Sequence, residues 1–390
     1  MRFLRGLATV VLLVAAAPAI AGEAVTGRWG DDTSCRALFF SADAPLTVTD
    51  YAVRWQADSC RIGRMYKTGD TVHIQALCWD LAGERSVPVS LRPHGGRIAV
   101  TWDRARRADV REELMSAPAI DLDAYFKRVG YDGPRDSSLA TLRRLHELHP
   151  QSIPFENLDP LLGRPVKLDL GRLQAKLVAG GRGGYCFEHN TLMAAVLRAL
   201  GYTVKEATGR VRWGVPEGVR MPRTHCLLLV EAEGGRYLTD VGFGGNVLTG
   251  PLKLASRDAQ ATPHEEFRLV DEDNGIVAQE ALIGDQWMQT YAFDFTEAHP
   301  ADFELGNWYT SAHPNSIFVN GLLGARVERG RRYGLRDNQL AVHTLGGATE
   351  KTTLKSAGEL RDALTDLFKL RLEGLTGLDD KLARLAEKTS

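Results

Sequence analysis

One cysteine at the end of a short glycine-rich segment is the feature that most constrains how this 390-residue chain folds. The segment GRGGYCFE at 181–188 is followed by apolar residues at helical spacing, so we expect Cys186 to open a helix that continues to Leu200. Backbone N–H groups and the positive dipole end of a helix favour a thiolate over a thiol. The sequence therefore predicts a nucleophilic thiolate at a glycine-lined helix start.

Two downstream strands carry a histidine and a carboxylate. The run THCLLLV at 224–230 reads as a buried strand, and RYLTDV at 236–241 reads as the strand that returns after a glycine turn. In either register that such a hairpin allows, His225 and Asp240 lie on the same face. The two-residue period of a strand places Cys226 on the other face, where we expect a core residue.

Cys186, His225 and Asp240 together supply a nucleophile, a base and an orienting acid. We expect the Asp240 carboxylate to hold the Nδ1–H of the His225 imidazole, which leaves Nε2 facing the thiol. His189, about one helical turn after the cysteine, is an alternative base, although a surface or cleft-lining role suits it better. The three residues therefore predict acyl transfer through a cysteine.

Several motifs, in the expected order, resemble those of the arylamine N-acetyltransferase family. RGGYCFE at 182–188 resembles the nucleophile motif of that family, and IPFENL at 153–158 resembles a motif upstream of it. The segments THCLLLV at 224–230 and DVGFG at 240–244 resemble the family's histidine and aspartate segments. NWYTSAHP at 307–314 resembles a motif near the family's cofactor cleft. The resemblance extends from about residue 119 to the C-terminus.

The resemblance implies an α+β fold in which a helical bundle, a β-barrel and an α/β lid follow one another. Apolar periodicity agrees with this order, because helical spacing prevails up to about residue 200 and strand patterns from 202 to about 295. A short strand is expected at 317–319 and a last helix at 357–368. The expected domains are a helical domain with the nucleophile at 119–200, a β-barrel with the histidine and the aspartate at 201–306, and the lid at 307–390.

For the activity, the resemblance implies transfer of an acyl group, usually acetyl from acetyl-CoA, to an arylamine, arylhydrazine or N-hydroxyarylamine. Acetyl-CoA acts there as a substrate, and we expect no permanently bound cofactor. We also expect no metal, because the sequence has no cysteine and histidine pairs at zinc spacing. An amide synthase or thiol hydrolase with the same three residues is an alternative. The non-enzyme alternative is an exported binding protein that acts through its N-terminal β domain.

Further residues are candidates for the binding of donor and acceptor. The glycine-rich run after Asp240 can admit a pantetheine arm or a pyrophosphate, although a tight turn explains it equally well. Core packing is an alternative for the aromatic candidates. We expect Arg182 and Glu156 to form an ion pair that supports the nucleophile loop. The donor candidates are Gly242, Phe243, Gly244, Gly245, Thr310, Ser311 and Ser316, and the acceptor candidates are Phe187, Phe243 and Trp213.

The first 118 residues lie outside the resemblance. Two arginines, an apolar run at 7–17 and a small-x-small site at 19–21 read as a secretory signal peptide over residues 1–21. The expected location is periplasmic or secreted, with an uncleaved anchor or a cytoplasmic protein as alternatives. Export conflicts with acetyl-CoA as donor, because acetyl-CoA is a cytoplasmic metabolite. Another thioester or activated acyl group would then replace it.

Residues 22–110 are expected to form a small antiparallel β domain, joined to the rest by a linker at 111–118. Short runs with partial alternation are separated by turn residues there. Cys35, Cys60 and Cys78 lie in this domain, and an exported domain of this size favours a disulfide. Each of the three pairings, and no pairing at all, remains open.

The net charge and the length of the apolar run limit the kinds of partner that we expect. The formal net charge of −1 gives no indication of a nucleic-acid partner, and the apolar run at 7–17 is too short for a stable membrane span. The expected partners are a small aromatic amine and an acyl donor. The sequence leaves the oligomeric state open.

Overall fold

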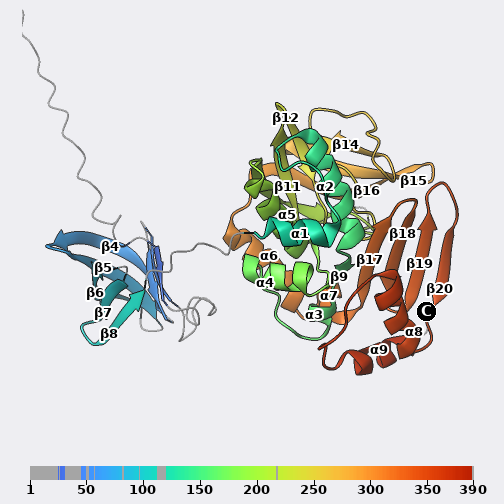
Figure 1. Cartoon of the computed structure of the whole chain (residues 1–390). Coiled ribbons are helices and arrows are strands. Elements are labelled where there is room, and N and C mark those ends of the chain that lie inside the picture. Colours follow the sequence, from blue (N-terminus) through green and yellow to red (C-terminus); the bar gives the residue numbers. More distant parts are fainter. Residues whose placement is uncertain are drawn as a thin grey trace, which may run out of the picture. The chain divides into compact units, whose positions relative to one another are not determined.

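The computed structural model describes residues 25, 27–30, 45–49, 52–56, 58–80, 83–95, 97–111, 120–216 and 218–388. The chain divides into two compact units, residues 1–116 and residues 117–390, each with its own hydrophobic core (Figure 1). The predicted signal peptide at 1–21, Cys35 and all but the first residue of the predicted linker at 111–118 lie outside the described residues.

The first unit is an antiparallel sheet in which each strand pairs with the next along the chain. Alternation gives the sheet one apolar face, on which β5 buries Val72 and Ile74. Trp55 and Trp102 pack against each other in this core, with ring centroids 5.9 Å apart. The prediction of a small antiparallel β domain is confirmed. The strands are β1 (Gly27–Trp29), β2 (Leu46–Val48), β3 (Ala52–Trp55), β4 (Asp58–Thr68), β5 (Thr71–Asp80), β6 (Gly83–His94), β7 (Arg97–Trp102) and β8 (Arg106–Arg111).

A disulfide joins β4 and β5. Cys60 and Cys78 lie directly opposite one another in the strand register, and their sulfur atoms are bonded. Both side chains are buried in the core of the sheet. Of the pairings that the sequence left open, the structure contains the one between neighbouring strands.

A helical bundle begins the second unit. Asp121 and Ser138 cap α1 and α2 by accepting the backbone N–H of the residue three positions later. The apolar stripes of α1, α2 and α5 meet in one core that contains Tyr125, Leu142 and Leu192. The helices are α1 (Leu122–Val129), α2 (Leu139–Ser152), α3 (Leu158–Leu161), α4 (Leu170–Leu173) with its continuation η2 (Gln174–Ala179), and α5 (Cys186–Ala199).

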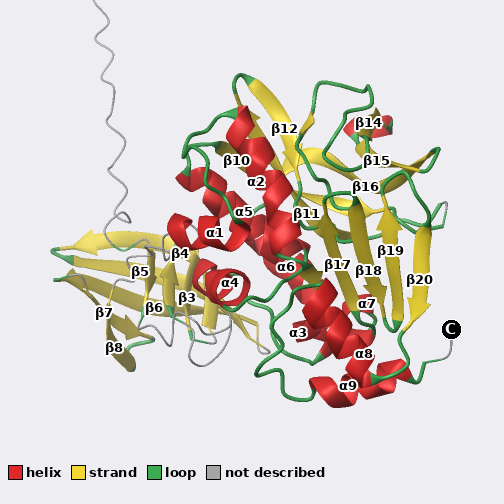
Figure 2. Ribbon diagram, turned by 45° about the vertical axis from the view of Figure 1, so that its right-hand side comes forward, coloured by secondary structure: helices red, strands yellow, loops and turns green. Residues whose placement is uncertain are grey.

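A seven-stranded antiparallel sheet follows the bundle, in the order β13-β12-β11-β10-β16-β15-β14. Figure 2 shows its strands in yellow and the helices of the bundle in red. β11 and β12 form the predicted hairpin with Leu228 opposite Thr239, which is one of the two registers that the sequence allowed. In this register His225 and Asp240 lie on one face, a diagonal apart. The strands are β10 (Thr203–Val211), β11 (Arg223–Ala232), β12 (Gly235–Thr239), β13 (Leu252–Lys253), β14 (Phe267–Asp271), β15 (Val277–Ile283) and β16 (Gln286–Glu297).

The lid contains a five-stranded sheet, in the order β20-β19-β18-β17-β9, against which α8 and α9 pack. β9 comes from the segment before the nucleophile, so the lid sheet reaches back into the first part of the unit. The predicted order of helical bundle, β-barrel and α/β lid is confirmed. The elements are β9 (Phe155–Glu156), α6 (Pro300–Ala312), α7 (Ile317–Asn320), β17 (Leu323–Glu328), β18 (Arg331–Arg336), β19 (Gln339–Thr344), β20 (Thr349–Thr353), α8 (Ala357–Asp362), η4 (Ala363–Leu367) and α9 (Leu378–Ala386).

Two details of the lid differ from the sequence expectation. The segment 317–319, expected as a strand, belongs to helix α7, because the Ser316 hydroxyl accepts the N–H of Phe318 and starts a helical turn. Helix α6 crosses the boundary that we placed between residues 306 and 307. Among the described residues, no helix is long and apolar enough to cross a membrane.

Replacing both Cys60 and Cys78 by serine should lower the free energy of unfolding of the β unit by about 3 kcal/mol, because the bond restricts the unfolded chain over the 18 residues that separate them. Hydrogen exchange of β5 peptides at increasing urea concentrations measures this change. Reduction with dithiothreitol should destabilise the wild type by the same amount as the double substitution and leave the serine variant unaffected. Equal stability of the two proteins without reductant would contradict the prediction.

Candidate active site

The loop before α5 lies so close to the preceding segment that only glycine fits. A Cβ atom at Gly183 would lie 1.9 Å from the carbonyl oxygen of Pro154, which no side chain tolerates. The Gly184 N–H donates to the same carbonyl, and the Glu156 N–H donates to the carbonyl of Gly184 at 2.7 Å. The glycines therefore allow two backbone segments to pair, and this pairing presents Cys186 as the first residue of α5.

The three predicted catalytic residues lie together. Nε2 of His225 is 2.7 Å from Oδ2 of Asp240, and both side chains are buried. The Cys186 thiol, at the start of α5, takes part in a hydrogen bond with His225 and also lies 3.7 Å from the carbonyl oxygen of Thr224. The structure thus brings a thiol, an imidazole and a carboxylate together.

The orientation of the imidazole differs from the sequence expectation. Nε2 of His225, and not Nδ1, faces Asp240, so Nδ1 remains for the side of Cys186. The carboxylate lies a diagonal step along the hairpin, farther away than a directly opposite residue. Nε2 is the ring nitrogen farther from the backbone, and it spans this larger distance.

In the catalytic triad of Cys186, His225 and Asp240, charge and burial shift the pKa values in opposite directions. Burial raises the pKa of Cys186, but hydrogen bonds from Cys226 and His225 and the positive charge of His225 lower this pKa to about 6. Burial lowers the pKa of His225, but the charge and the hydrogen bond of Asp240 raise it to about 10. Between these two values the site holds a thiolate beside an imidazolium.

The carboxylate of Asp240 is held from two further sides. Its Oδ1 accepts the side-chain amide of Asn190 and the backbone N–H of Gly242, each at 2.9 Å. Asn190 lies four residues after Cys186, on the same side of α5. Asn190 was not among the site residues predicted from the sequence, although its helical spacing from Cys186 is a signal that identifies it.

Aromatic rings surround His225. The Phe243 ring meets it edge-on at 5.2 Å between centroids, and Tyr291 of β16 lies 4.6 Å away. Phe243 is thus in place to line the site, and Tyr291 is a neighbour that was not predicted from the sequence. Phe187 is fully buried between Tyr185 and Phe303, so core packing explains this ring, which we had expected at an acceptor wall.

The first of the glycines predicted to admit the donor, Gly242, lies next to Cys186. A Cβ atom at Gly242 would lie 2.8 Å from Cα of Cys186, so the backbone passes directly over the nucleophile. Gly244 has a φ of 93°, which favours glycine. A Cβ atom at Gly245 would meet nothing within 4 Å, so there is room for a side chain at this position.

Two of the other predicted donor residues, Ser311 and Ser316, have structural roles in the lid helices. Ser311 donates to the carbonyl of Asn307 within α6, and Ser316 donates to the carbonyl of Thr310 while capping α7. The hydroxyl of Thr310 is buried without a hydrogen-bond partner. Both serine hydroxyls therefore have hydrogen-bond partners within the protein and need no ligand to provide one.

The expected ion pair behind the nucleophile loop is present. Arg182 lies 2.7 Å from Glu156, whose side chain is fully buried. Lys176 extends the network, because its Nζ lies 2.6 Å from Asp159 and 2.7 Å from Glu188. Three carboxyl groups thus share two cations, and burial raises the pKa of Glu188 to about 7.

His189 is not the alternative base. It is buried, which corrects the expected position at the surface or the cleft. Its Nε2 lies 3.0 Å from the carbonyl of Gly184, so Nε2 donates, and its Nδ1 accepts from Nε2 of His149 at 2.9 Å. Both ring nitrogens are occupied, and desolvation by burial lowers the pKa of His189 to about 4.

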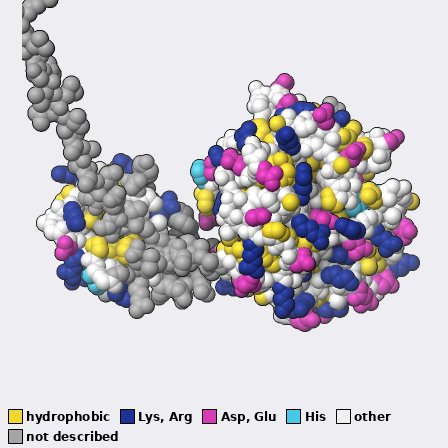
Figure 3. Space-filling view, turned by 45° about the horizontal axis from the view of Figure 1, so that its top comes forward, with side chains coloured by type: hydrophobic (Ala, Val, Ile, Leu, Met, Phe, Trp, Pro, Cys, Tyr) yellow, Lys and Arg dark blue, Asp and Glu magenta, His cyan; other side chains and the backbone are white. Residues whose placement is uncertain are grey.

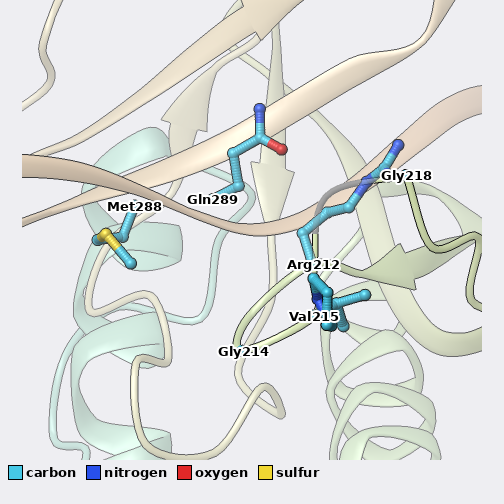
Figure 4. Close-up of a pocket in the computed structure, with 7 residues that line it drawn as sticks. Arg212, Gly214, Val215, Gly218, Met288 and Gln289 are labelled. Carbon is cyan, nitrogen blue, oxygen red and sulfur yellow. The ribbon is translucent and has the colours of Figure 1, made fainter.

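A pocket of about 360 Å³ lies outside the triad (Figure 4). Its residues come from the segment that follows β10 and from β16, and none of the triad residues lines it. Trp213, expected at an acceptor wall, belongs to the same segment and is 38% exposed. No group of His, Cys, Asp or Glu in the described part of the chain is arranged to hold a metal ion. The pocket is lined by Arg212, Gly214, Val215, Pro216, Gly218, Met288 and Gln289.

Comparisons with known proteins agree with this geometry. The family model described as N-acetyltransferase matches residues 138–376. The arylamine N-acetyltransferase of Mycobacterium tuberculosis is 44% identical over 277 residues, which cover 68% of this chain and 97% of the relative. That of Escherichia coli is 39% identical over 260 residues, which cover 66% and 90%.

Solved structures are similar over the same share of the chain. The M. smegmatis arylamine N-acetyl transferase superposes with a TM-score of 0.66 at 41% identity, and the match covers 69% of this chain and all of that one. The Mycobacterium marinum enzyme in complex with CoA gives 0.65 at 39%, covering 68% and 99%. With the ordered motifs and the placed triad, these matches show that the chain belongs to the arylamine N-acetyltransferase family.

Proposed function

We propose that this enzyme transfers an acyl group from a thioester donor to an arylamine-type acceptor through an acyl-cysteine on Cys186. The observation that carries the proposal is the buried His225–Asp240 pair beside a thiol whose pKa is lowered to about 6. Family membership supports it, as does the CoA bound to the M. marinum relative. Acetyl-CoA is the donor that we propose on these grounds.

The first half-reaction acylates the enzyme. The Cys186 thiolate attacks the carbonyl carbon of the thioester, and the backbone N–H groups at the start of α5 stabilise the negative oxygen that forms. The bond to the donor sulfur breaks, and the departing thiolate takes the proton that the His225 imidazolium carries. The products are an acyl-cysteine, a neutral imidazole and a free thiol.

The second half-reaction transfers the acyl group. The amine nitrogen attacks the acyl-cysteine, and His225 takes the proton that the nitrogen loses as the new amide bond forms. The carbon–sulfur bond breaks and returns the Cys186 thiolate beside the imidazolium. Because the donor thiol leaves before the amine reacts, the kinetics are ping-pong.

The surface and the charge support small-molecule partners. On the face of the second unit drawn in Figure 3, basic and acidic side chains are interspersed, in keeping with the net charge of −1. Such a surface provides no extended basic patch to attract a nucleic acid on that face.

The N-terminal features support export. Residues 1–21 have the pattern of a secretory signal, and a disulfide such as Cys60–Cys78 is typical of proteins in an oxidising compartment. We therefore propose a periplasmic or secreted location. An exported enzyme would not ordinarily meet acetyl-CoA, so in that location it would use a thioester or activated acyl donor of its own compartment.

Replacing Cys186 by serine should abolish acyl transfer and leave the fold intact, because a hydroxyl is far less acidic than this thiol. The assay is p-nitrophenyl acetate turnover with and without an arylamine, and we expect the amine to stimulate the wild type. Hydrolysis without stimulation would indicate a thiol hydrolase, and no turnover would indicate a binding protein. Wild-type activity in the serine variant would contradict the assignment of Cys186.

Replacing Asp240 by asparagine should reduce the transfer rate at least about a hundredfold, because the carboxylate charge stabilises the imidazolium. It should also raise the pKa of Cys186, so the pH midpoint of iodoacetamide labelling should move upward from about 6. Below this midpoint the thiol is protonated and labelling slows. Asp285→Asn, at an exposed turn carboxylate, is the control and should leave both quantities unchanged. If Asp240→Asn behaves like this control, His225 has another partner.

Intact mass spectrometry tests the location. Cleavage after Ala21 should give a mature chain that begins at Gly22, contains a disulfide and keeps Cys186 as a free thiol. A chain that retains Met1 and five free thiols would contradict export and would leave acetyl-CoA available as the donor.

A further inference from the structure

One buried arginine of the lid reaches the loop that covers the nucleophile. Arg332 lies on β18, and its side chain is only 6% exposed. Nε donates to both carboxylate oxygens of Glu265 at 2.8 Å, and Nη2 also donates to this carboxylate. Glu265 lies just before β14, so the pair joins the lid sheet to the barrel.

The same guanidinium holds two backbone carbonyls. Nη1 donates to the carbonyl of Gly245 at 3.3 Å, and Nη2 donates to that of Val247 at 3.0 Å. These carbonyls belong to residues 242–247, here called the glycine loop, which begins two residues after Asp240. The planar fork of an arginine can bind a carboxylate on one side and carbonyls on another, which the single ammonium of a lysine cannot reproduce.

The other end of the glycine loop is fixed at the active site. The Gly242 N–H donates to Asp240, and the close approach to Cys186 leaves no room for a side chain. Between the two ends, the Phe243 ring packs on His225 and on Tyr291, each 5.2 Å away. Arg332 therefore fixes the far end of a segment whose near end covers the nucleophile.

We propose that Arg332 is a positioning residue that anchors the glycine loop from the lid, and thereby holds Phe243 against His225 where the acyl donor approaches Cys186. The alternative is a purely structural ion pair between lid and barrel. The two hydrogen bonds from Arg332 to backbone carbonyls distinguish these roles. An apolar pair in place of Arg332 and Glu265 can restore packing but cannot bind the carbonyls of the loop.

The test compares the double variant Arg332→Met with Glu265→Leu to the wild type. Removing both charges avoids an unpaired buried carboxylate, so the double variant should stay folded. Amide exchange of peptides covering the glycine loop should accelerate about tenfold, since two hydrogen bonds to a charged group are lost. The KM for acetyl-CoA should rise about tenfold, with a smaller change in kcat.

Arg326→Met is the matched control. Arg326 lies on β17 of the same sheet, pairs with Glu328 and donates to the carbonyls of Leu367 and Gln151. Its strand register opposite Tyr333 places it on the other face of the sheet from Arg332. Loss of this arginine should therefore leave the exchange of the glycine loop and the donor KM unchanged.

A single lysine substitution provides a second, independent measurement. Arg332→Lys keeps the charge opposite Glu265 but cannot reach both carbonyls, so loop exchange should remain fast while the stability of the fold recovers. The midpoint of iodoacetamide labelling of Cys186 should stay near pH 6 in all of these variants, because Asn190 and the Gly242 N–H still hold Asp240.

If amide exchange of the glycine loop in the double variant is as slow as in the wild type, the proposed anchoring role of Arg332 is wrong. The proposal is also wrong if the control Arg326→Met accelerates this exchange equally, since the effect would then be general to the lid. The KM readout rests on the proposed acyl transfer, whereas the exchange readout does not. If the wild type fails to turn over acetyl-CoA, the proposed donor is wrong, and the exchange rates still decide the role of Arg332.

Discussion

The buried carboxylate of Asp240 is the group on which the catalytic unit depends. A charge removed from water is costly unless it is paired and hydrogen-bonded, so its neighbours have to be in place. Its side chain binds His225 of β11, Asn190 of α5 and the N–H of Gly242, and its own carbonyl accepts from His146 of α2. One residue therefore joins the helical bundle, the barrel and the loop over the nucleophile.

Two close approaches of backbone complete this arrangement. Gly183 lets the nucleophile loop pair with the segment at Pro154, and Gly242 lets the chain after Asp240 pass over Cys186. Because neither place has room for a Cβ atom, the nucleophile is held between two glycines. A small positional change at either glycine would shift the thiol relative to its imidazole, which is why the motif tolerates no side chain there.

Much of the site is readable from the sequence because it depends on local rules. The start of a helix after a glycine run places Cys186, and strand alternation through a short hairpin places His225 and Asp240 on one face. Asn190 follows from helical spacing as well. Local rules do not extend to ring orientation, and the imidazole presents Nε2 to the carboxylate because the partner lies on the diagonal.

The sequence by itself determined the elements, the nucleophile, the base and the acid, and the presence of an additional β unit. Only the tertiary structure decided which further residues surround the catalytic groups. Tyr291 and Phe243 pack around the imidazole, and Cys226 lies beside the thiol. Arg332 of the lid binds the glycine loop next to them. Hydrophobic periodicity records which face of an element is buried but not what packs against it. The wrongly expected strand at 317–319 has the same origin, because a short apolar run fits a strand or a helix until a capping hydroxyl decides.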